Sequence, residues 1–269
     1  MLSYRATLDV PDATARTVTR WLADHRRAHD IRPHQRAATC WSQTVMVLRW
    51  LVEATNVRVL ARDSGISIAT AYRYLHEALD VISQHAPDLI DTLKELVEAG
   101  ESYVCLDGTL IHTDRVDERS ESGKHLWYSG KHKAFGGNVQ VLTDSTGYPV
   151  WVAPVEPGST HDLTAARTHV LGAVHKAASQ GMPTLADKGY QGAGIGVKTP
   201  FKGKELGIKQ EAYNAFQGAM RAPAERANAL LKDFKALKHV TLDPRAITKI
   251  TATALVILNL NTGYAPVLP

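Results

Sequence analysis

The stretch Val104-Cys105-Leu106-Asp107-Gly108-Thr109 places a carboxylate directly after a short apolar run. Residues 103–106 have the pattern of a buried strand, and Asp107 is expected to end it. A second predicted strand runs up to Asp187, in Leu-Ala-Asp-Lys-Gly-Tyr. If the two strands are neighbours, both carboxylates emerge at one edge of the sheet, where open α/β sheets usually bind ligands.

A third acidic residue, Glu225, follows Pro223 by two positions. At about 100° per residue, Glu225, Asn228 and Lys232 share one narrow helix face. The opposite, apolar face is expected to pack on the sheet and to leave the polar face toward the two aspartates. Pro223 disfavours a helical Ala222, so a kink or a helix start is expected there. The apolar face consists of Ala227, Leu230, Leu231, Phe234 and Leu237.

Three carboxylates from separate elements suit hard divalent cations. Oxygen ligands can hold two such ions about 3.5 to 4 Å apart, where they act on the attacking and leaving oxygens of a phosphodiester. We therefore expect two Mg²⁺ or Mn²⁺ ions near Asp107, Asp187 and Glu225.

Asp162 competes with Asp187 for the middle position. Thr160 and Asp162 are expected to open a helix, where free backbone amides and the helix dipole favour a carboxylate. Capping or support of a metal ligand is therefore the more economical role for Asp162. A softer metal site is a further alternative, disfavoured by its scattered spacing; its members are His112, Asp114, His132 and His161.

The chain divides near residue 98. Residues 1–98 hold almost no glycine and repeat apolar residues at helical spacing, whereas strand patterns begin after Gly100. We expect an all-α domain over 1–98, followed over 99–269 by a mixed sheet with helices on its faces. Predicted helices cover 13–27, 36–55, 57–63, 67–85, 87–98, 160–180 and the segment from about 210 onward; predicted strands cover 103–106, 138–143, 149–155, a segment ending at 187, and 197–201, with a hairpin turn at 144–147.

Residues 57–74 match a helix-turn-helix. Ala61 allows close helix packing, Gly65 is placed to reverse the chain, and Ser67 is a natural N-cap for the second helix. Such a unit is expected to contact DNA, with a plain helical hairpin as the alternative. In the second helix, Ile68, Ala71 and Leu75 are expected to face inward and Thr70, Arg73 and His76 outward.

The 269 residues are 44% hydrophobic and 22% charged, which is typical of a globular protein. Cys40 and Cys105 lie in apolar stretches without a Cys-x-x-Cys spacing, so a disulfide framework or zinc cluster is not expected and a reducing cytoplasm fits best. No apolar run resembles a signal peptide or reaches the roughly 20 residues that span a bilayer. We expect a soluble, cytoplasmic protein.

The net charge of +4 is unevenly distributed. From Lys198 to Lys249 there are eleven Lys or Arg against five Asp or Glu, a local charge of +6. This excess suits a polyanion lying across a metal site, although a solvated basic surface is the alternative. The lysines expected to hold phosphates are Lys131, Lys133, Lys188, Lys198, Lys202 and Lys204.

Five motifs occur in order: Asp107-Gly-Thr, Tyr128-Ser-Gly-Lys-His-Lys, Gly158-Ser-Thr-His-Asp, Ala186-Asp-Lys-Gly-Tyr, and Arg221-x3-Glu225-x6-Lys232. Together they resemble the DDE superfamily of bacterial insertion-sequence transposases, with that family's helix-turn-helix in front. The resemblance extends from about residue 35 to about residue 260. It implies a ribonuclease-H-like fold whose metal ligands are Asp107, Asp187 and Glu225.

The resemblance also implies that Arg221 and Lys232 contact DNA or orient the carboxylate. The tyrosine often found three residues before that arginine is Gly218 here, and Pro223 within the last motif is a second departure.

A transposase of this kind binds the double-stranded ends of its element and its target DNA, works as a dimer or larger assembly, and needs no membrane. It cleaves one strand and transfers the released 3′-hydroxyl. The alternatives are an inactive, transposase-derived DNA-binding protein and a metal-dependent endonuclease without strand transfer. The intact acidic triad favours an enzyme, because carboxylates weaken binding beside phosphates unless a metal offsets their charge.

Overall fold

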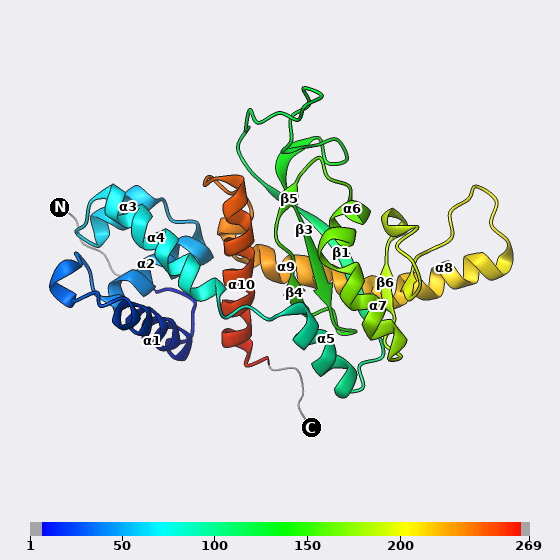
Figure 1. The fold of residues 1–269 in the computed structure, drawn as a ribbon, viewed down its shortest axis with the longest axis horizontal. Coiled ribbons are helices and arrows are strands. Elements are labelled where there is room, and N and C mark those ends of the chain that lie inside the picture. The colour runs from blue at the N-terminus through cyan, green and yellow to red at the C-terminus, as the bar shows by residue number, and fades with distance from the viewer. Residues whose placement is uncertain (1–6, 265–269) are drawn as a thin grey trace.

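The computed structural model describes residues 7–264. In Figure 1, helices α1–α4 form a group on the left, α10 stands between that group and a central sheet, and α8 extends away from the sheet on the right. The helices are α1 (Asp12–Ala28), α2 (Cys40–Glu53), α3 (Val57–Asp63), α4 (Ile68–Ser83), α5 (Leu89–Glu98), α6 (Asp162–His169), α7 (Leu171–Ser179), α8 (Ile208–Arg221), α9 (Glu225–Asp233) and α10 (Ile247–Thr262).

Seven strands form one mixed sheet. Strand β1 lies in its middle, antiparallel to β3 and parallel to β6, and β6 pairs in parallel with β7. Strands β2, β4 and β5 all pair antiparallel with β3. This arrangement confirms the predicted ribonuclease-H-like mixed sheet flanked by helices. The strands are β1 (Val104–His112), β2 (Tyr128–Ser129), β3 (Ala134–Thr143), β4 (Pro149–Val152), β5 (Glu156–Pro157), β6 (Thr184–Ala186) and β7 (Val197–Lys198).

Strand β1 is longer than the sequence predicts. It continues to His112, so Asp107 lies inside the strand and the prediction that Asp107 ends it is wrong. Pairing with β3 persists from Cys105 opposite Thr143 to His112 opposite Gly136. The residues after Gly108 are Thr-Leu-Ile, which fit a pleated and buried surface, and this pairing outweighs the break expected at Asp-Gly.

The predicted helix over 160–180 is two helices, α6 and α7. The break is at Val170, whose φ of −124° lies outside the helical region. The side chain of Val170 is buried in the same apolar cluster as Leu171 and Val174 of α7. The strands predicted over 149–155 and 197–201 are shorter and end at Val152 and Lys198. The hairpin turn over 144–147 is confirmed, because Asp144 Oδ1 accepts hydrogen bonds from the backbone N–H groups of Thr146 and Tyr148.

The bounds of α3 are those expected, whereas the helix predicted over 36–55 begins only at Cys40, with Thr39 as its N-cap, and ends at Glu53. Ser67 caps α4 by accepting a hydrogen bond from the Thr70 N–H, while Ala71 and Leu75 are buried as predicted. Ile68 is 41% exposed, so its predicted inward orientation is wrong. The buried face of α4 starts only at Ala71, which leaves the first helical position outside it.

Helix α10 connects the N-terminal helices to the sheet. One continuous buried cluster includes Leu79 of α4, Ile257 of α10 and Val141 of β3. A second cluster joins Leu93 of α5 to Leu106 of β1. Helix α5 therefore packs with the sheet, and the division near residue 98 remains a prediction. None of the helices within 7–264 is both long and apolar enough to cross a membrane.

The turn between β3 and β4 supports the segment that leads into α9. Gly147 has a φ of +82°, and a Cβ atom there would overlap the carbonyl oxygen of Pro223 in the short helix η3 (Ala222–Ala224). A left-handed backbone conformation alone costs an L-residue about 1 to 2 kcal/mol. We expect Gly147→Ala to lower the free energy of unfolding by more than this, because the added methyl group also overlaps Pro223. Urea denaturation measures the loss.

Gly123→Ala is the matched control for this variant, because Gly123 has a φ of +78° with nothing within 4 Å of the added Cβ. Equal losses in the two variants would show that the contact between Gly147 and Pro223 does not contribute.

Candidate active site

Asp107 in β1 and Asp187, the residue after β6, lie at the same level of the sheet. Leu106 of β1 is in register with Ala186 of β6, and the next residue of each segment is an aspartate. Asp187 Oδ1 accepts a hydrogen bond from the Gly189 N–H at 2.7 Å, which fixes the carboxylate beside the turn that follows β6. The sheet thus brings together the two residues that were expected to meet at its edge.

Asp162 reaches the same region from the start of α6. Its Oδ1 accepts a hydrogen bond from Asn138 Nδ2 at 2.8 Å, and its Oδ2 pairs with Lys131 Nζ at 2.9 Å. A Cβ atom on Gly108 would overlap Asp162 Oδ1, so this carboxylate lies directly against the backbone of β1. The carboxylate makes these contacts instead of capping α6, whose N-cap residue is His161 without a side-chain cap.

A chain of buried hydrogen bonds supports Asn138. Tyr190 Oη donates to Gln140 Oε1 at 2.6 Å, and Gln140 Nε2 donates to Asn138 Oδ1 at 3.0 Å. Asn138 Nδ2 also donates to the Thr160 carbonyl. No motif points to Asn138 or Gln140; the only signal in the sequence is two polar residues spaced by two in an otherwise apolar strand. This network fixes where Asp162 meets the sheet.

Asp107, Asp187 and Asp162 bring three negative charges together beside β1, where Asp107 is partly buried. Burial raises the pKa of Asp107, the positive charge of Arg221 opposes this, and the negative charges of Asp187 and Asp162 raise the pKa further. The hydrogen bond to Asp162 raises the pKa of the Lys131 ammonium, and the negative charges of Asp187 and Asp107 add to this effect. A bound cation offsets such a charge.

Glu225 is the first residue of α9 and is exposed. Asn228, one turn later, donates from Nδ2 to Asp107 Oδ2 at 3.3 Å. Residues three apart lie on one helix face, so Glu225 is on the face directed toward Asp107. The negative charges that raise the pKa of Asp107 are those of Asp187 and Asp162, and Glu225 is not among them. Asp162 therefore belongs with Asp107 and Asp187 in one group of carboxylates.

The expected faces of α9 are confirmed, since Ala227, Leu231 and Phe234 are buried while Glu225 is exposed. Pro223 lies in η3, between α8 and α9, where a kink or helix start was expected.

Side-chain hydrogen bonds attach the end of α8 to the sheet, and one of them runs from Gln217 Nε2 to the Lys198 carbonyl of β7. Gln217 Nε2 donates to the Ala186 carbonyl next to Asp187, and Tyr103 Oη donates to the Met220 carbonyl at 3.1 Å. These contacts place Arg221 where its charge acts on Asp107. Gly218 has nothing within 4 Å of an added Cβ.

The lysines predicted to hold phosphates lie at several places. Lys131 and Lys133 are in the turn between β2 and β3, Lys188 follows Asp187, and Lys198 ends β7. All four are exposed. Lys202 and Lys204 lie in the exposed loop before α8, and the charge of Lys232 acts on His112. Thr70 and Arg73 are on α4, in the separate group of helices (Figure 1).

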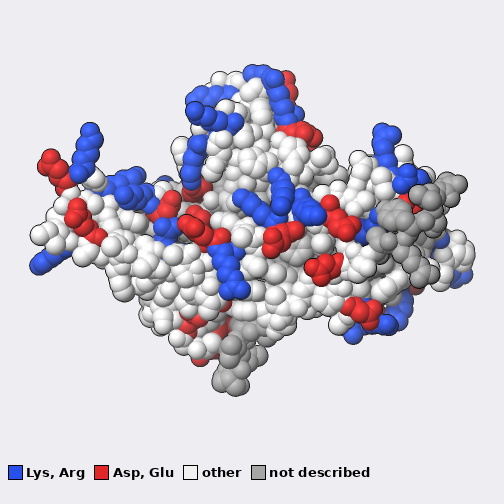
Figure 2. All heavy atoms as spheres, turned by 180° about the vertical axis from the view of Figure 1, so that it is seen from behind, with Lys and Arg blue, Asp and Glu red and all other residues white. Residues whose placement is uncertain are grey.

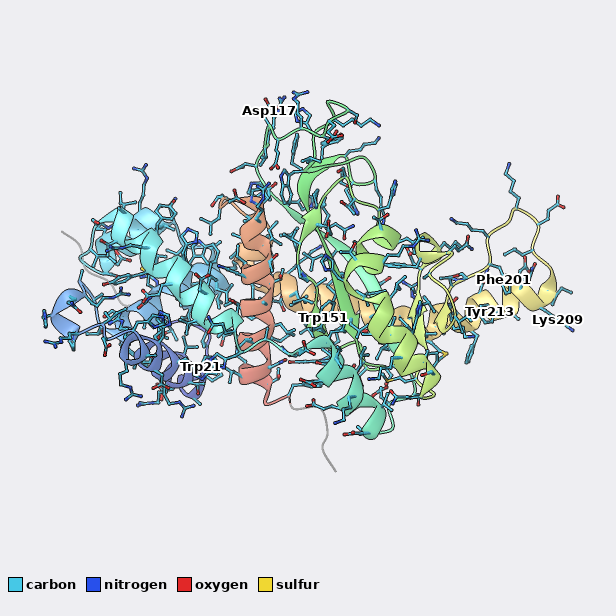
Figure 3. The ribbon with its side chains drawn as sticks, viewed as in Figure 1. Trp21, Asp117, Trp151, Phe201, Lys209 and Tyr213 are labelled. Carbon is cyan, nitrogen blue, oxygen red and sulfur yellow. The ribbon has the colours of Figure 1, made fainter. Side chains whose placement is uncertain are left out.

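The loop before α8 is held by side chains. Phe201 packs edge-on against Tyr213 with ring centroids 5.2 Å apart, and Asn214 makes hydrogen bonds with both the N–H and the carbonyl of Phe201 (Figure 3). The loop and α8 therefore form one projecting arm, which spans residues 199–221.

A family model described as DDE superfamily endonuclease matches residues 106–259, which include all four acidic candidates. The chain belongs to this family. A model of archaeal ISC1217 transposases matches residues 41–147, which include α3, α4 and β1. No curated protein and no solved structure matches the chain. As a DDE superfamily member the protein is a nuclease related to transposition, and transposases act on DNA.

Endonucleases of the DDE superfamily generally use divalent metal ions. The donors fit, because carboxylate oxygens are the hard ligands that Mg²⁺ prefers and a cation relieves the repulsion around Asp107. Within residues 7–264 no three His, Cys, Asp or Glu side chains stand close enough to form a complete cage. Mg²⁺ is usually bound through one or two carboxylates and keeps waters and substrate phosphates as further ligands.

The close approach of Asp162 to β1 requires glycine at position 108. We expect Gly108→Ala to displace the Asp162 carboxylate and to lower metal-dependent DNA cleavage by about a hundredfold, since small misplacements at reacting centres have effects of that size. Gel assays of cleavage measure the rate, and circular dichroism checks the fold. Gly172→Ala, in α7 with nothing within 4 Å of the added Cβ, is the control. Wild-type cleavage by Gly108→Ala would show that the position of Asp162 is unimportant.

Proposed function

We propose that this DDE superfamily protein is a transposase that binds the double-stranded ends of its mobile element, cleaves a strand and joins the 3′-hydroxyl to target DNA. The observation that carries the proposal is the meeting of Asp107, Asp187 and Asp162 beside the start of α9 in a ribonuclease-H-like sheet. Bound Mg²⁺ or Mn²⁺ supplies charge stabilisation to the attacking and leaving oxygens of the phosphodiester.

We assign Asp107, Asp187 and Glu225 as the ligands of two such ions. Asn228 orients Asp107 through its amide hydrogen bond, and Glu225 is on the same helix face one turn earlier. Asp162 is the alternative to Asp187 as the middle ligand, because its carboxylate also adjoins Asp107. Its pairing with Lys131 favours a supporting role, in which Asn138 and Lys131 fix its position.

The reaction requires no covalent intermediate with the protein. The cysteine nearest the carboxylates is Cys105, and burial raises the pKa of its thiol to about 11. The thiol is therefore protonated at neutral pH and is a poor nucleophile. We propose water and the DNA 3′-hydroxyl as the nucleophiles.

The helical region is proposed to bind the element ends through α3 and α4 as a helix-turn-helix. The start of α4 presents side chains to solvent: Arg73 and His76 are exposed, and Tyr72 is 40% exposed. Thr70 is half-buried, and its hydroxyl accepts a hydrogen bond from the Ser67 hydroxyl. The N-terminal residues of a recognition helix are those that contact bases.

Phosphates are proposed to contact Lys131, Lys133, Lys188, Lys198, Lys202, Arg221 and Lys232. Figure 2 shows one face of the molecule on which Lys and Arg lie in separate groups with Asp and Glu between them. Separate groups of Lys and Arg side chains can contact phosphates at several points along a duplex, and each neutralised phosphate adds to the binding. Pairing of two DNA ends by two or more copies would complete the transposition reaction.

An endonuclease that cuts without strand transfer is the second candidate, because the matching family model is described as an endonuclease. Labelled DNA from the flanks of the gene, incubated with target plasmid and Mg²⁺ or Mn²⁺, separates the two. Joined products indicate a transposase, and cleavage products alone indicate the endonuclease.

Removal of single charges tests the ligand assignment. We expect Asp107→Asn, Asp187→Asn and Glu225→Gln each to abolish cleavage and to leave DNA binding largely intact, because the amide keeps the shape and loses the charge that holds the ions. Asp162→Asn should retain partial activity. The measurements are the cleavage rate in Mg²⁺ or Mn²⁺ and the DNA affinity in EDTA, with Asp91→Asn on the exposed surface of α5 as control. An inactive Asp162→Asn beside an active Asp187→Asn would reverse the assignment of the middle ligand.

Substitution on α4 tests the proposed recognition helix. Arg73→Ala should weaken binding to the element ends by about tenfold or more, the usual effect of losing one base contact of about 1 to 3 kcal/mol. Binding to random duplexes should change less, and a phosphate contact would weaken both alike. Arg20→Ala, an exposed arginine of α1, is the control. Unchanged affinity for both kinds of duplex would remove α4 from the DNA interface.

A further inference from the structure

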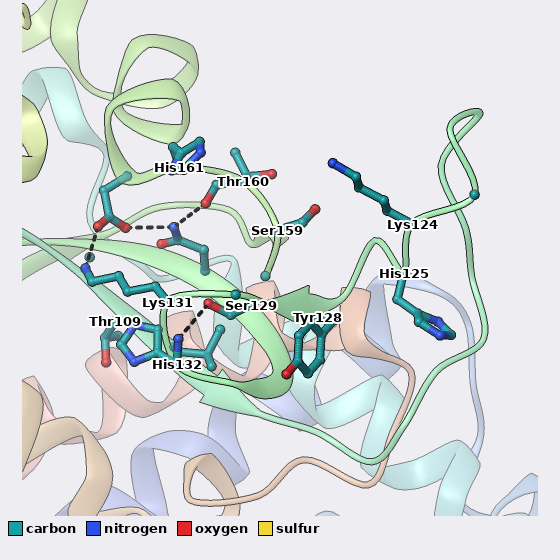
Figure 4. A pocket seen from close by; sticks show the side chains of 17 residues that line it. Thr109, Lys124, His125, Tyr128, Ser129, Lys131, His132, Ser159, Thr160 and His161 are labelled. Atoms are coloured by element: carbon teal, nitrogen blue, oxygen red, sulfur yellow. Dashed lines mark hydrogen bonds and ion pairs between the residues drawn. The ribbon is translucent and has the colours of Figure 1, made fainter.

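A cavity of about 580 Å³ opens next to the carboxylates. It shares Asp162, Asn138 and Gly108 with the candidate active site, so the two are continuous. Figure 4 shows two segments that line the cavity. The loop before β2 contributes Lys124 and His125, and the segment before α6 contributes Ser159, Thr160 and His161. The cavity therefore extends from the carboxylates toward that loop.

The lining combines an aromatic ring with cationic and hydroxyl groups. Tyr128 is 38% exposed, and its ring is held edge-on by Phe135 with ring centroids 5.2 Å apart. Lys124 and His132 line the same cavity and are exposed. Asp162 is the single carboxylate among the described lining residues, and it is paired with Lys131. A fixed aromatic face surrounded by basic groups is the combination that binds single-stranded nucleic acid.

The size of the cavity sets which part of a DNA molecule fits. Pockets of roughly 300 to 1,000 Å³ bury small organic ligands, and a nucleotide is of that class. A duplex is far larger than such a ligand, so it can lie across the opening of the cavity but cannot be enclosed by it. Bases inside a duplex are stacked and paired, so only nucleotides released from pairing can place a base against Tyr128.

We propose that this cavity binds unpaired nucleotides of the DNA strand adjoining the phosphate to be cleaved. Tyr128 stacks on a base, Lys124 and His132 hold the backbone phosphates, and the hydroxyls of Ser159 and Thr160 are available to the sugar or the base edge. The proposal rests on the proposed function, because it places the strand by reference to the carboxylates. It implies that the protein binds an element end more tightly when the pairs beside the cleavage point are open.

The test compares three fluorescent DNAs with one element-end sequence: a full duplex, a duplex with unpaired nucleotides at the flank, and the single strand. Fluorescence anisotropy in EDTA gives each affinity. Wild-type protein should prefer the flank-opened duplex by about tenfold over the full duplex, the effect of one stacked base. Tyr128→Ala should lose this preference, and Tyr128→Phe should keep it.

Phe216→Ala is the control, because Phe216 is an aromatic residue 65% exposed on α8, outside the cavity. It should retain the preference, and thermal melting should show that each variant folds. Equal affinity of the wild type for the paired and opened duplexes, or a retained preference in Tyr128→Ala, overturns this inference and leaves the proposed function in place. Failure to bind any of the DNAs overturns the proposed function and this inference together.

Discussion

The register of β1 against its two neighbours is the constraint on which the candidate site depends. Backbone hydrogen bonds align Leu106 with Ala186 in β6, which sets the two following aspartates side by side. On the other edge the same strand pairs Gly108 with Gln140 and Leu110 with Asn138 of β3. A slip of one residue would reverse every side chain of β1 and remove Asp107 from this group. The extended pairing with β3 therefore also protects the geometry of the carboxylates.

The polar groups around the carboxylates are held by burial as much as by hydrogen bonds. Tyr190 is fully buried, and its hydroxyl begins the chain that passes through Gln140 and Asn138 to Asp162. A buried network of this kind is rigid when each member is satisfied, because an unpaired member is costly. The repulsion between the aspartates is the opposing effect. The proposed cation site needs the negative charge of these aspartates close together. The packing of the rest of the sheet supplies the stability that offsets their repulsion.

The segment that carries Glu225 depends on contacts far away in the sequence. Gln217 and Tyr103 attach the end of α8 to the sheet, Pro223 packs on the turn at Gly147, and the apolar face of α9 is buried. These three contacts orient α9 so that Asn228 reaches Asp107. Helix α10 in turn joins the sheet to the helices that are proposed to bind DNA. The buried cluster that includes α4 and α10 also contains Ala227 and Leu231 of α9, so it connects α4 to the helix that carries Glu225.

The sequence by itself determined the mixed sheet, the helical region, the turn at Asp144 and the exposed and buried faces of α9, because local periodicity, capping and turn residues encode them. It also predicted that Asp107 and Asp187 emerge together. Only the tertiary structure decided that β1 continues past Asp107, that Val170 divides a predicted helix and that Ile68 is exposed, since these depend on which partners cover each segment. The meeting of Asp162 with Gly108, the network through Asn138 and the cavity at Tyr128 likewise join residues distant in sequence, and no local pattern records such contacts.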